Sequence, residues 1–457
     1  MRNLAVILPY AVSIRDFVHT GTLDQLLSIP DVRMQIYTQN PALPEFDAIR
    51  SDRVSIFEMA EPHDSRVEQL LKTIYPLMFY DTFYYVRQAL AASRLKRILA
   101  KGLVAMRRII GTQRTLRLYA RLLLATAPRP TANQIVGDPD LVIATRSTIN
   151  SLDYGLLVEA ARRRLPQLTA ASSWDNFTTK GFFPFPVVRI VVWNRKMADE
   201  LEQIFDVDAD TIVEAGYPRL RLLENSGTIR DGPDYLGRIG LGSYRRFILY
   251  SASYAELTRV AGDPVPREYR LIREVAARLA PTLPNDTCIL VRLHPFSKSE
   301  DESFFADIPH LRVFVPGRGD RYVERVMSEA DEVHLAAQLR FSECIVSMAS
   351  TMTIDALAVG RPVINVAFEP DGAAPGMISN FYRFNHFRDL IATVHLPLAH
   401  DANEVTRFVE RSMTGSDALT DGDTPDMVAF EKLYVPENSR AYPNVVRRVV
   451  EELLIDA

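Results

Sequence analysis

A cluster of small hydroxyl side chains lies between two apolar runs in the stretch CIVSMASTMTIDALAVGRPVINVAF, residues 344–368. The two runs read as buried strands, and the segment between them reads as a short helix that begins near Thr351. Ligands of open α/β sheets bind at the carboxyl ends of the strands, so the turn before this helix is the expected place for a ligand. Ser350 can cap the helix there, and the unpaired N–H groups of its first turn suit an anion such as phosphate. A structural alternative is that Ser350 and Thr351 only cap the helix.

Two other strand ends point to the same chemistry. The run VRLHPF, residues 291–296, ends a predicted strand with His294, and Arg292 two residues earlier lies on the same strand face. The run FILYSASY, residues 247–254, brings Ser251 and Ser253 to the same edge of the sheet. His294 would also suit a satisfied core position, but three strand ends carrying hydroxyls and an imidazole predict a site for nucleotide phosphate.

The elements that position these residues alternate along the chain. Short β-branched runs alternate with longer helical patterns, which predicts parallel sheets built from βαβ units. A chain of 457 residues is long enough for two or three domains. A stretch that is rich in Gly, Asn and Asp, near 220–245, separates two such series. The predicted strands are residues 4–9, 33–38, 54–57, 141–145, 167–172 and 189–193 in the first half, and 246–252, 288–295, 311–316, 344–347 and 362–368 in the second.

The motifs, taken in order, resemble a group of bacterial GT-B glycosyltransferases. RLHP (292–295) is followed by S-x-x-S-T-x-x-x-D-A (347–356) and then by GRPVI (360–364). This order is similar to that of the capsule, Kdo and sialyl transferases with a His-Pro motif, and of the CDP-glycerol glycerophosphotransferases. Segments that resemble the group's acceptor-side loops and its later His-containing segment are SIRDFVHTGTLDQL (13–26), SSWDNFTTKG (172–181), VVWNRKMADEL (191–201), EAGYPRL (214–220) and FYRFNHFRDLI (381–391).

The resemblance implies two Rossmann-like domains that face each other across a cleft. Residues 1–220 would form the acceptor-side domain, with a basic helical insertion at about 75–135, and 221–245 would be a linker. Residues 246–440 would bind the nucleotide donor, and 441–457 would form a C-terminal helix. His294, Ser350 and Thr351 would contact donor phosphate, with help from Ser251, Ser253 and Arg292. Asp355 would hold a ribose hydroxyl, a role that related retaining enzymes usually give to Glu, and His386 would lie near the donor.

The acceptor side offers two carboxylates. An inverting transfer needs a base that takes the proton of the acceptor hydroxyl. Asp175 follows the predicted strand 167–172, beside Trp174 as a sugar platform and with Asn176 and Lys180 close in sequence. Asp16 follows the first strand, and His19 is in the same loop. We favour Asp175 as the base, with Asp16 as the alternative, although Asp175 and Asn176 would equally suit an Asx turn.

A catalytic metal is not expected. The Asp-x-Asp matches at 138–140, 206–210 and 421–423 fall in predicted polar turns. The chain has neither a Walker A run nor a G-x-G-x-x-G motif, and no cofactor is expected. Its two cysteines lie in apolar runs, which fits a reducing cytosol.

Residues 82–137 contain no acidic residue and 11 basic ones. Because the whole chain has a net charge of −4, the remainder carries −4 − 11 = −15. Basic residues interleaved with apolar ones at helical spacing are typical of helices on anionic membrane surfaces. The preceding aromatic run YPLMFYDTFYYV, residues 75–86, suits the same interface. The alternatives are a solvated helix pair and RNA binding, but no nucleic-acid module accompanies the charge and we expect no nucleic-acid partner.

The leading functional prediction is a metal-independent glycosyltransferase of polysaccharide biosynthesis, such as that of capsule or lipopolysaccharide. Its donor would be a CMP-, CDP- or UDP-linked sugar, and its acceptor a surface glycan or a lipid-linked molecule. We expect a cytoplasmic, peripheral protein at the inner face of the cell membrane. The alternatives are a CDP-glycerol-type glycerophosphotransferase, an enzyme like the UDP-sugar 2-epimerases, and an inactive protein that binds the membrane surface.

Overall fold

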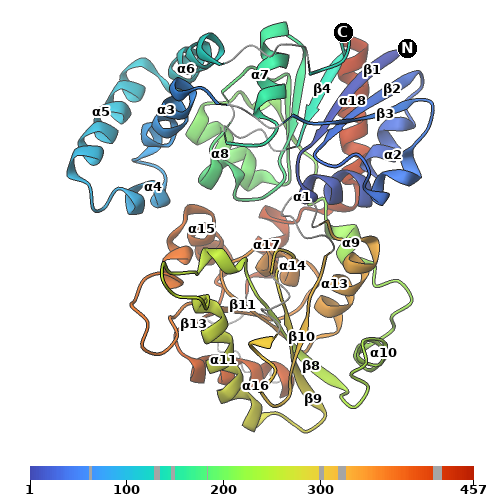
Figure 1. Cartoon of the computed structure of the whole chain (residues 1–457), viewed down its shortest axis with the longest axis vertical. Helices are drawn as coiled ribbons and strands as arrows, with labels where there is room; N and C mark the ends of the chain where they lie inside the picture. Colours follow the sequence, from blue (N-terminus) through green and yellow to red (C-terminus); the bar gives the residue numbers. More distant parts are fainter. Residues whose placement is uncertain are drawn as a thin grey trace. The chain divides into compact units, whose positions relative to one another are not determined.

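The computed structural model describes residues 1–60, 64–127, 134–145, 150–182, 184–297, 303–317, 326–414 and 425–456. The chain forms two compact units (Figure 1). The first unit contains residues 1–218, 384–386 and 433–457, and the second contains 219–383 and 387–432.

The first unit is built on a seven-stranded sheet of order β3-β2-β1-β4-β5-β6-β7. Every neighbouring pair in it is parallel. The order runs outward in both directions from β1 and β4, so the topological switch point lies between these two strands. The strands are β1 (Arg2–Leu8), β2 (Val32–Thr38), β3 (Val54–Glu58), β4 (Leu141–Ala144), β5 (Gln167–Ala170), β6 (Arg189–Val192) and β7 (Ile212–Glu214).

The second unit repeats this topology with six strands in the order β10-β9-β8-β11-β12-β13. All of its pairs are parallel too, and its switch point lies between β8 and β11. Two doubly wound α/β units confirm the predicted fold class. The strands are β8 (Arg246–Ser251), β9 (Thr287–Arg292), β10 (Leu311–Phe314), β11 (Ile345–Ser347), β12 (Val363–Val366) and β13 (Leu398–Ala399).

All eleven strands predicted from apolar runs are confirmed, with ends shifted by a few residues. The two missed strands, β7 and β13, lie at sheet edges and have three and two residues. Edge strands need only one apolar face, so their sequences lack the continuous apolar run of a central parallel strand.

Helices connect the strands in both units. Those of the first are α1 (Ala11–Ile14), α2 (Thr22–Leu27), α3 (Arg66–Ile74), α4 (Tyr84–Ala89), α5 (Arg94–Ile110), α6 (Thr112–Thr126), α7 (Tyr154–Arg163), α8 (Arg195–Phe205) and α18 (Tyr442–Asp456). Those of the second are α9 (Leu220–Glu224), α10 (Gly232–Arg238), α11 (Arg267–Leu279), α13 (Glu329–Phe341), α14 (Met352–Ala358), α16 (Ala402–Thr414) and α17 (Met427–Leu433). The helix α15 (Asn385–Val394) begins in the segment that belongs to the first unit.

The segment 221–245, predicted as a linker, contains most of α9 and all of α10, and α9 packs against α13 and α14. The predicted C-terminal helix is present as α18, and it packs against α2.

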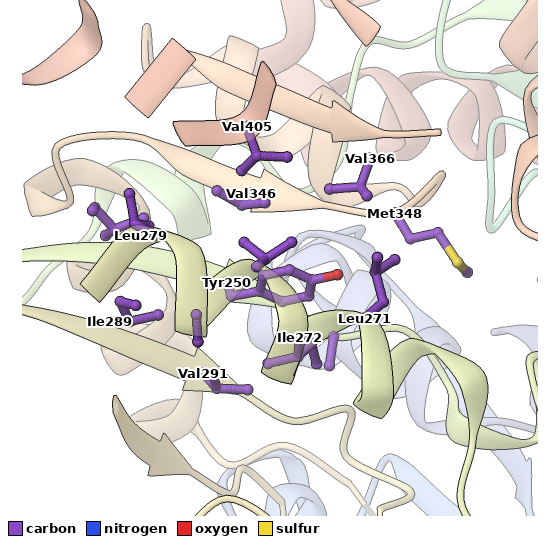
Figure 2. Close-up of a cluster of buried hydrophobic side chains, with 14 of the residues drawn as sticks. Tyr250, Leu271, Ile272, Leu279, Ile289, Val291, Val346, Met348, Val366 and Val405 are labelled. Carbon is purple, nitrogen blue, oxygen red and sulfur yellow. The ribbon is translucent and has the colours of Figure 1, made fainter. Parts of the chain in front are cut away.

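Alternation along the strands divides the interior of the second unit into two faces. On one face, side chains such as Tyr250, Val291 and Val346 pack against α11 and α16, as Figure 2 shows. Residues of the opposite parity point to the other face, where α13 contacts β8 and α14 contacts β11. The polar residues that end these strands belong to this second face.

The aromatic run 75–86, predicted to suit a membrane interface, is in part core, while Tyr80, Tyr84 and Tyr85 are half-buried. Tyr75, Phe79 and Phe83 are buried. Their rings contact other aromatic residues of the first unit, including Phe205 and Tyr119. Composition alone does not separate the two roles, because aromatic side chains suit both a core and an interface. The basic segment that follows does form amphipathic helices, α5 and α6 (Figure 1).

Gly216 packs directly against the backbone of Ser439, close to where α18 begins. Its φ is +97°, and a Cβ there would lie 2.6 Å from the Ser439 backbone nitrogen and closer still to its Cα. The Ser439 hydroxyl also accepts the N–H of Tyr217 at 2.9 Å. A side chain at this position would therefore have to displace the 437–441 segment.

We predict that Gly216→Ala destabilises the first unit by about 3 kcal/mol or more, from left-handed strain plus the clash. Gly137→Ala is the matched control, because Gly137 also has a positive φ, +61°, but its Cβ would meet nothing within 4 Å. The control should cost only about 1 kcal/mol. Thermal unfolding of the two variants checks this, and equal melting temperatures would contradict it.

Candidate functional site

The candidate site of the second unit lies at the switch point between β8 and β11. Polar residues at the ends of neighbouring strands are paired in register across the sheet: Arg292 with Ser251, Ser251 with Ser347, and Ser347 with Asn365, the last residue but one of β12. All four side chains are buried. The chain segments that continue from β9, β8 and β11 carry His294, Tyr254 and Ser350, which are half-buried and so remain accessible.

Hydrogen bonds fix the turn between β11 and α14. The Ser347 hydroxyl lies 3.0 Å from that of Ser350 and donates to the Met348 carbonyl at 2.8 Å. The Ser350 Oγ accepts the N–H of Met352, the first residue of α14, at 3.2 Å. Ser350 therefore caps this helix as predicted, while Thr351 occupies the N-cap position without a side-chain bond. Since α14 has only seven residues, hydroxyls rather than a long helix dipole are the main polar groups here.

His294 is held as a neutral hydrogen-bond donor. Its Nδ1 accepts the backbone N–H of Phe296 at 3.2 Å, so the remaining proton lies on Nε2. Burial, and to a smaller extent the charge of Arg292, lower the pKa of His294 to about 4. His294 is therefore a neutral ring that presents one N–H. The rings of Tyr254 and Phe296 pack against it, with centroids at 5.5 and 5.0 Å.

The positive charge near this edge belongs to Arg292. Its guanidinium donates to Gln338 Oε1 at 2.8 Å and lies over the Phe314 ring. Burial lowers its pKa to about 10, so it remains charged at neutral pH. Within the described ranges no carboxylate forms an ion pair with Arg292. The carboxylates of Glu332 and Asp331, in the first turn of α13, act on this guanidinium from beyond ion-pair distance and offset part of its charge.

Sequence reasoning missed the residue that holds the loop after β8. Glu268, in the first turn of α11, is fully buried and both of its carboxylate oxygens accept the N–H of Ser253, at 3.1 and 3.0 Å. Burial raises the pKa of Glu268 to about 7, although the hydrogen bonds from Ser253 oppose the shift. A glutamate near a helix start is common, so the sequence carried no signal for this contact.

Asp355 is engaged in an ion pair rather than open to a ligand. Its carboxylate is 0% exposed and lies 2.7 Å from the Arg219 guanidinium, which is itself buried. This contact joins α14 to the residue just before α9. We therefore leave the ribose contact unassigned and give Asp355 a structural role.

In the first unit, Asp175 lies at the N-terminal end of a π-helical turn, Asn176–Lys180, that follows β5. Its carboxylate accepts from the hydroxyls of Ser173 and Thr179 and pairs with Lys180 at 3.1 Å. Burial alone would raise the pKa of Asp175, but the charges of Lys180 and His386 and these hydrogen bonds outweigh it and hold the pKa below its ordinary value. Asp175 is thus firmly ionised and only a weak proton acceptor.

The neighbours of Asp175 differ from what was expected. Trp174 is 4% exposed, and its ring meets that of His386 edge-on at 4.8 Å and that of Tyr434 at 6.3 Å. A buried indole offers no open face to a sugar, so the platform interpretation does not fit. His386, expected beside the donor, belongs with this first-unit cluster. Asn176 is also buried and accepts from Lys180 at 3.4 Å.

Asp16 lies in a second π-helical turn, Arg15–His19, after β1. It is buried and pairs with Arg15 at 2.8 Å. Both ring nitrogens of His19 are buried without a hydrogen-bond partner among the described residues. π-Helical turns are rare and often mark functional sites, and here two of them follow strands of one sheet.

The Asp-x-Asp segments lie at turns where the structure describes them. Asp138 pairs with Arg163, Asp140 with Arg2, and Asp208 accepts the N–H of Asp210. Residues 421–423 lie outside the described residues. Among the residues that are described, no cluster of three or more His, Cys, Asp or Glu side chains has the arrangement of a metal site.

We predict that Asp355→Ala lowers stability by about 3–5 kcal/mol, because it leaves the Arg219 guanidinium buried without its partner. The double variant Arg219→Met/Asp355→Leu should recover most of the loss, since it removes both charges. Thermal unfolding measures both effects. If Asp355 instead contacts ribose, the double variant will be stable but will bind nucleotide at least tenfold more weakly.

Solved structures share this fold. S. aureus MnaA, in a co-structure with UDP, gives a TM-score of 0.55 at 10% identity, covering 99% of this chain and 97% of that chain. A putative UDP-N-acetylglucosamine 2-epimerase from Listeria monocytogenes gives 0.56 at 11% identity, with 100% and 97% covered. The Methanocaldococcus jannaschii UDP-GlcNAc 2-epimerase, in complex with UDP-GlcNAc and UDP, gives 0.53 at 10% identity, with 99% and 100% covered. No family model and no curated protein sequence matches the chain. At these identities the likeness shows the fold, which is GT-B: two Rossmann-like units with parallel sheets.

Proposed function

We propose that the chain is a glycosyltransferase that moves a sugar from a nucleotide-activated donor to a surface-glycan or lipid-linked acceptor. One observation carries the proposal: the polar ends of β9, β8 and β11 meet in register at the switch point of the second sheet. Ligands of doubly wound sheets bind at this point, and the groups gathered there are hydrogen-bond donors suited to phosphate oxygens.

In this proposal the donor diphosphate is bound by His294, Ser350 and Thr351. The Nε2–H of His294 donates to a phosphate oxygen, and the hydroxyls of Ser350 and Thr351 donate to others. Arg292 contributes charge from beneath, without direct contact. Donors fixed around the departing phosphate stabilise the negative charge that grows on it during transfer. Ser251 and Ser253, which are buried, position the loop rather than bind the ligand.

The acceptor side is proposed to lie in the first unit, with Asp175 as the base of an inverting transfer and Asp16 as the alternative. Because its pKa is held low, Asp175 stays ionised throughout the working pH range. As a weak proton acceptor it would take the proton late, once bonding to the sugar has made the acceptor hydroxyl strongly acidic. Lys180, beside it, suits an anionic group on the acceptor. Asp175→Asn should therefore slow transfer while leaving nucleotide affinity unchanged.

Three features bear on substrates and location. The structural neighbours include proteins solved with UDP or UDP-GlcNAc, which supports a UDP-linked donor over CMP- or CDP-linked ones. The motif order supports membership of the His-Pro group of capsule, Kdo and sialyl transferases and CDP-glycerol glycerophosphotransferases. No described helix has the length and hydropathy needed to cross a membrane. We propose a cytoplasmic protein that works peripherally at the inner face of the cell membrane.

A second candidate function is 2-epimerisation of a UDP-sugar. It is supported by the printed names of neighbours with TM-scores above 0.5, which are UDP-GlcNAc 2-epimerases. The same phosphate site would serve both reactions, since each acts on a substrate whose sugar is bonded to the nucleotide phosphate.

We predict that His294→Ala, or Ser350→Ala with Thr351→Ala, weakens nucleotide binding by about 10- to 100-fold without unfolding, since contacts to a charged group are worth about 1.5–3 kcal/mol. His400→Ala is the control, because His400 is an exposed histidine of the same unit. Isothermal titration with UDP, CDP and CMP measures the affinities. Wild-type affinity in a folded His294→Ala variant would overturn the site.

The pH dependence tests the neutral state of His294. Because the pKa of His294 is lowered to about 4, its ring is neutral in the folded protein at neutral pH. Its contribution to the free energy of unfolding is lost as pH falls from about 6.5 towards 4. The ratio of UDP affinities of wild type and His294→Asn should therefore stay constant between pH 5.5 and 8. Taking the ratio cancels the ionisation of the ligand. A ratio that grows as pH falls through 6.5 would show that an imidazolium binds the phosphate instead.

Product analysis separates the two reactions. The protein is incubated with UDP-GlcNAc, with and without a membrane extract as acceptor source, and products are resolved by chromatography. We expect UDP release that depends on the acceptor and that survives EDTA. A 2-epimer formed without acceptor would select the epimerase instead. Strict dependence on re-added Mg²⁺ or Mn²⁺ would contradict the metal-independent mechanism.

A further inference from the structure

The helix α5 exposes an apolar face that no described part of the chain covers. Five of its large apolar side chains are substantially solvent-exposed, from 39% to 85%. At 3.6 residues per turn they lie within about a third of the helix circumference, so they form one continuous stripe. The stripe consists of Leu95 (79% exposed), Ile98 (58%), Leu99 (52%), Met106 (39%) and Ile109 (85%).

Basic side chains flank this stripe. Arg94, Lys101 and Arg108 follow one another at seven-residue spacing along one border, and Lys96 lies on the other. All four are exposed. For Arg94, Lys96 and Lys101 the described structure has no ion-pair partner, and neither α5 nor α6 contains an acidic residue.

The opposite side of α5 packs against the rest of the first unit. Ala100 and Val104 are buried there. Arg107 is buried as well and pairs with Asp81 at 2.8 Å, over the ring of Phe79. The exposed stripe is therefore not needed to hold α5 in place. Packing of the opposite side orients the helix so that the stripe faces outward.

We infer that α5 binds an anionic lipid bilayer by lying in the interfacial plane with this apolar stripe inserted. A helix of 17 residues is about 25 Å long, and its sequence does not permit it to span the bilayer, so it would lie flat. The flanking Arg and Lys side chains reach lipid phosphates while their alkyl stems remain in the apolar layer. A protein partner would have to match an apolar stripe and three cations without ion-pair partners in the described structure, beside Arg108, which pairs with Asp81, whereas an anionic bilayer offers both environments at once.

The inference that α5 binds lipid does not depend on the proposed transferase function. The two can be tested apart, because lipid binding and nucleotide binding are separate measurements. The test is co-sedimentation of the whole protein with vesicles of phosphatidylcholine alone or with one-third phosphatidylglycerol. We expect binding to the anionic vesicles that weakens as salt rises. Leu95→Ser with Leu99→Ser should reduce it at least tenfold, and Arg94→Gln, Lys96→Gln and Lys101→Gln together should reduce it similarly.

Leu257→Ser with Val428→Ser is the matched control, since these side chains are 51% and 78% exposed in the second unit. This control should bind vesicles like the wild type, and UDP affinity should be equal in all variants. The inference is overturned by a wild type that ignores anionic vesicles at low salt, by equal binding to neutral vesicles, or by a Leu95/Leu99 variant that binds undiminished. It is also overturned if the wild type is a dimer without lipid and the serine variant a monomer, because the stripe would then cover a second copy.

Discussion

Parallel pairing of β8 with both β9 and β11 is the constraint on which the candidate nucleotide site depends. The register brings Arg292, Ser251 and Ser347 into one row at the strand ends. A slip of one residue in any strand would turn its last polar side chain towards the apolar face that packs on α11 and α16. The tightly packed core on that face, with Tyr250 and Val346 at its centre, therefore also fixes the register of the polar row.

Electrostatics at this edge follow from how the charges are buried. Arg219 is neutralised by Asp355, whereas Arg292 has only the amide of Gln338 and the thioether of Met327 as polar partners in the described structure. The carboxylates of Glu332 and Asp331 act on this guanidinium from a distance and offset part of the cost of its burial, and the proposed phosphate would offset more of it. A protonated His294 would add a second charge beside Arg292, which is one reason that its pKa is lowered. The site thus combines one distant permanent charge with neutral donors at the point of contact.

The sequence predicts the sheets well and the site only in part. Central parallel strands are apolar on both faces, so their runs stand out, and Ser350 follows such a run at a recognisable helix start. Contacts between distant segments have no comparable signal. The pairing of Asp355 with Arg219, and the hydrogen bonds that the Ser253 N–H donates to the Glu268 carboxylate, depend on how α9 and α11 dock onto the sheet. The same limit explains the aromatic run 75–86, whose burial depends on distant residues such as Phe182 and Phe205.

The basic segment illustrates how burial gives identical side chains different roles. Asp81 lies just before the acid-free window and binds both Arg107 and Arg108. The arginine that is buried in this contact, Arg107, holds α5 to the unit, and the charge of Arg108 is partly offset. The positive charge left for a partner therefore comes from residues that the fold does not use, chiefly Arg94, Lys96 and Lys101. Because the inferred membrane binding and the folding of the unit use different faces of α5, the helix can be fully folded in water and still present its apolar stripe to a membrane.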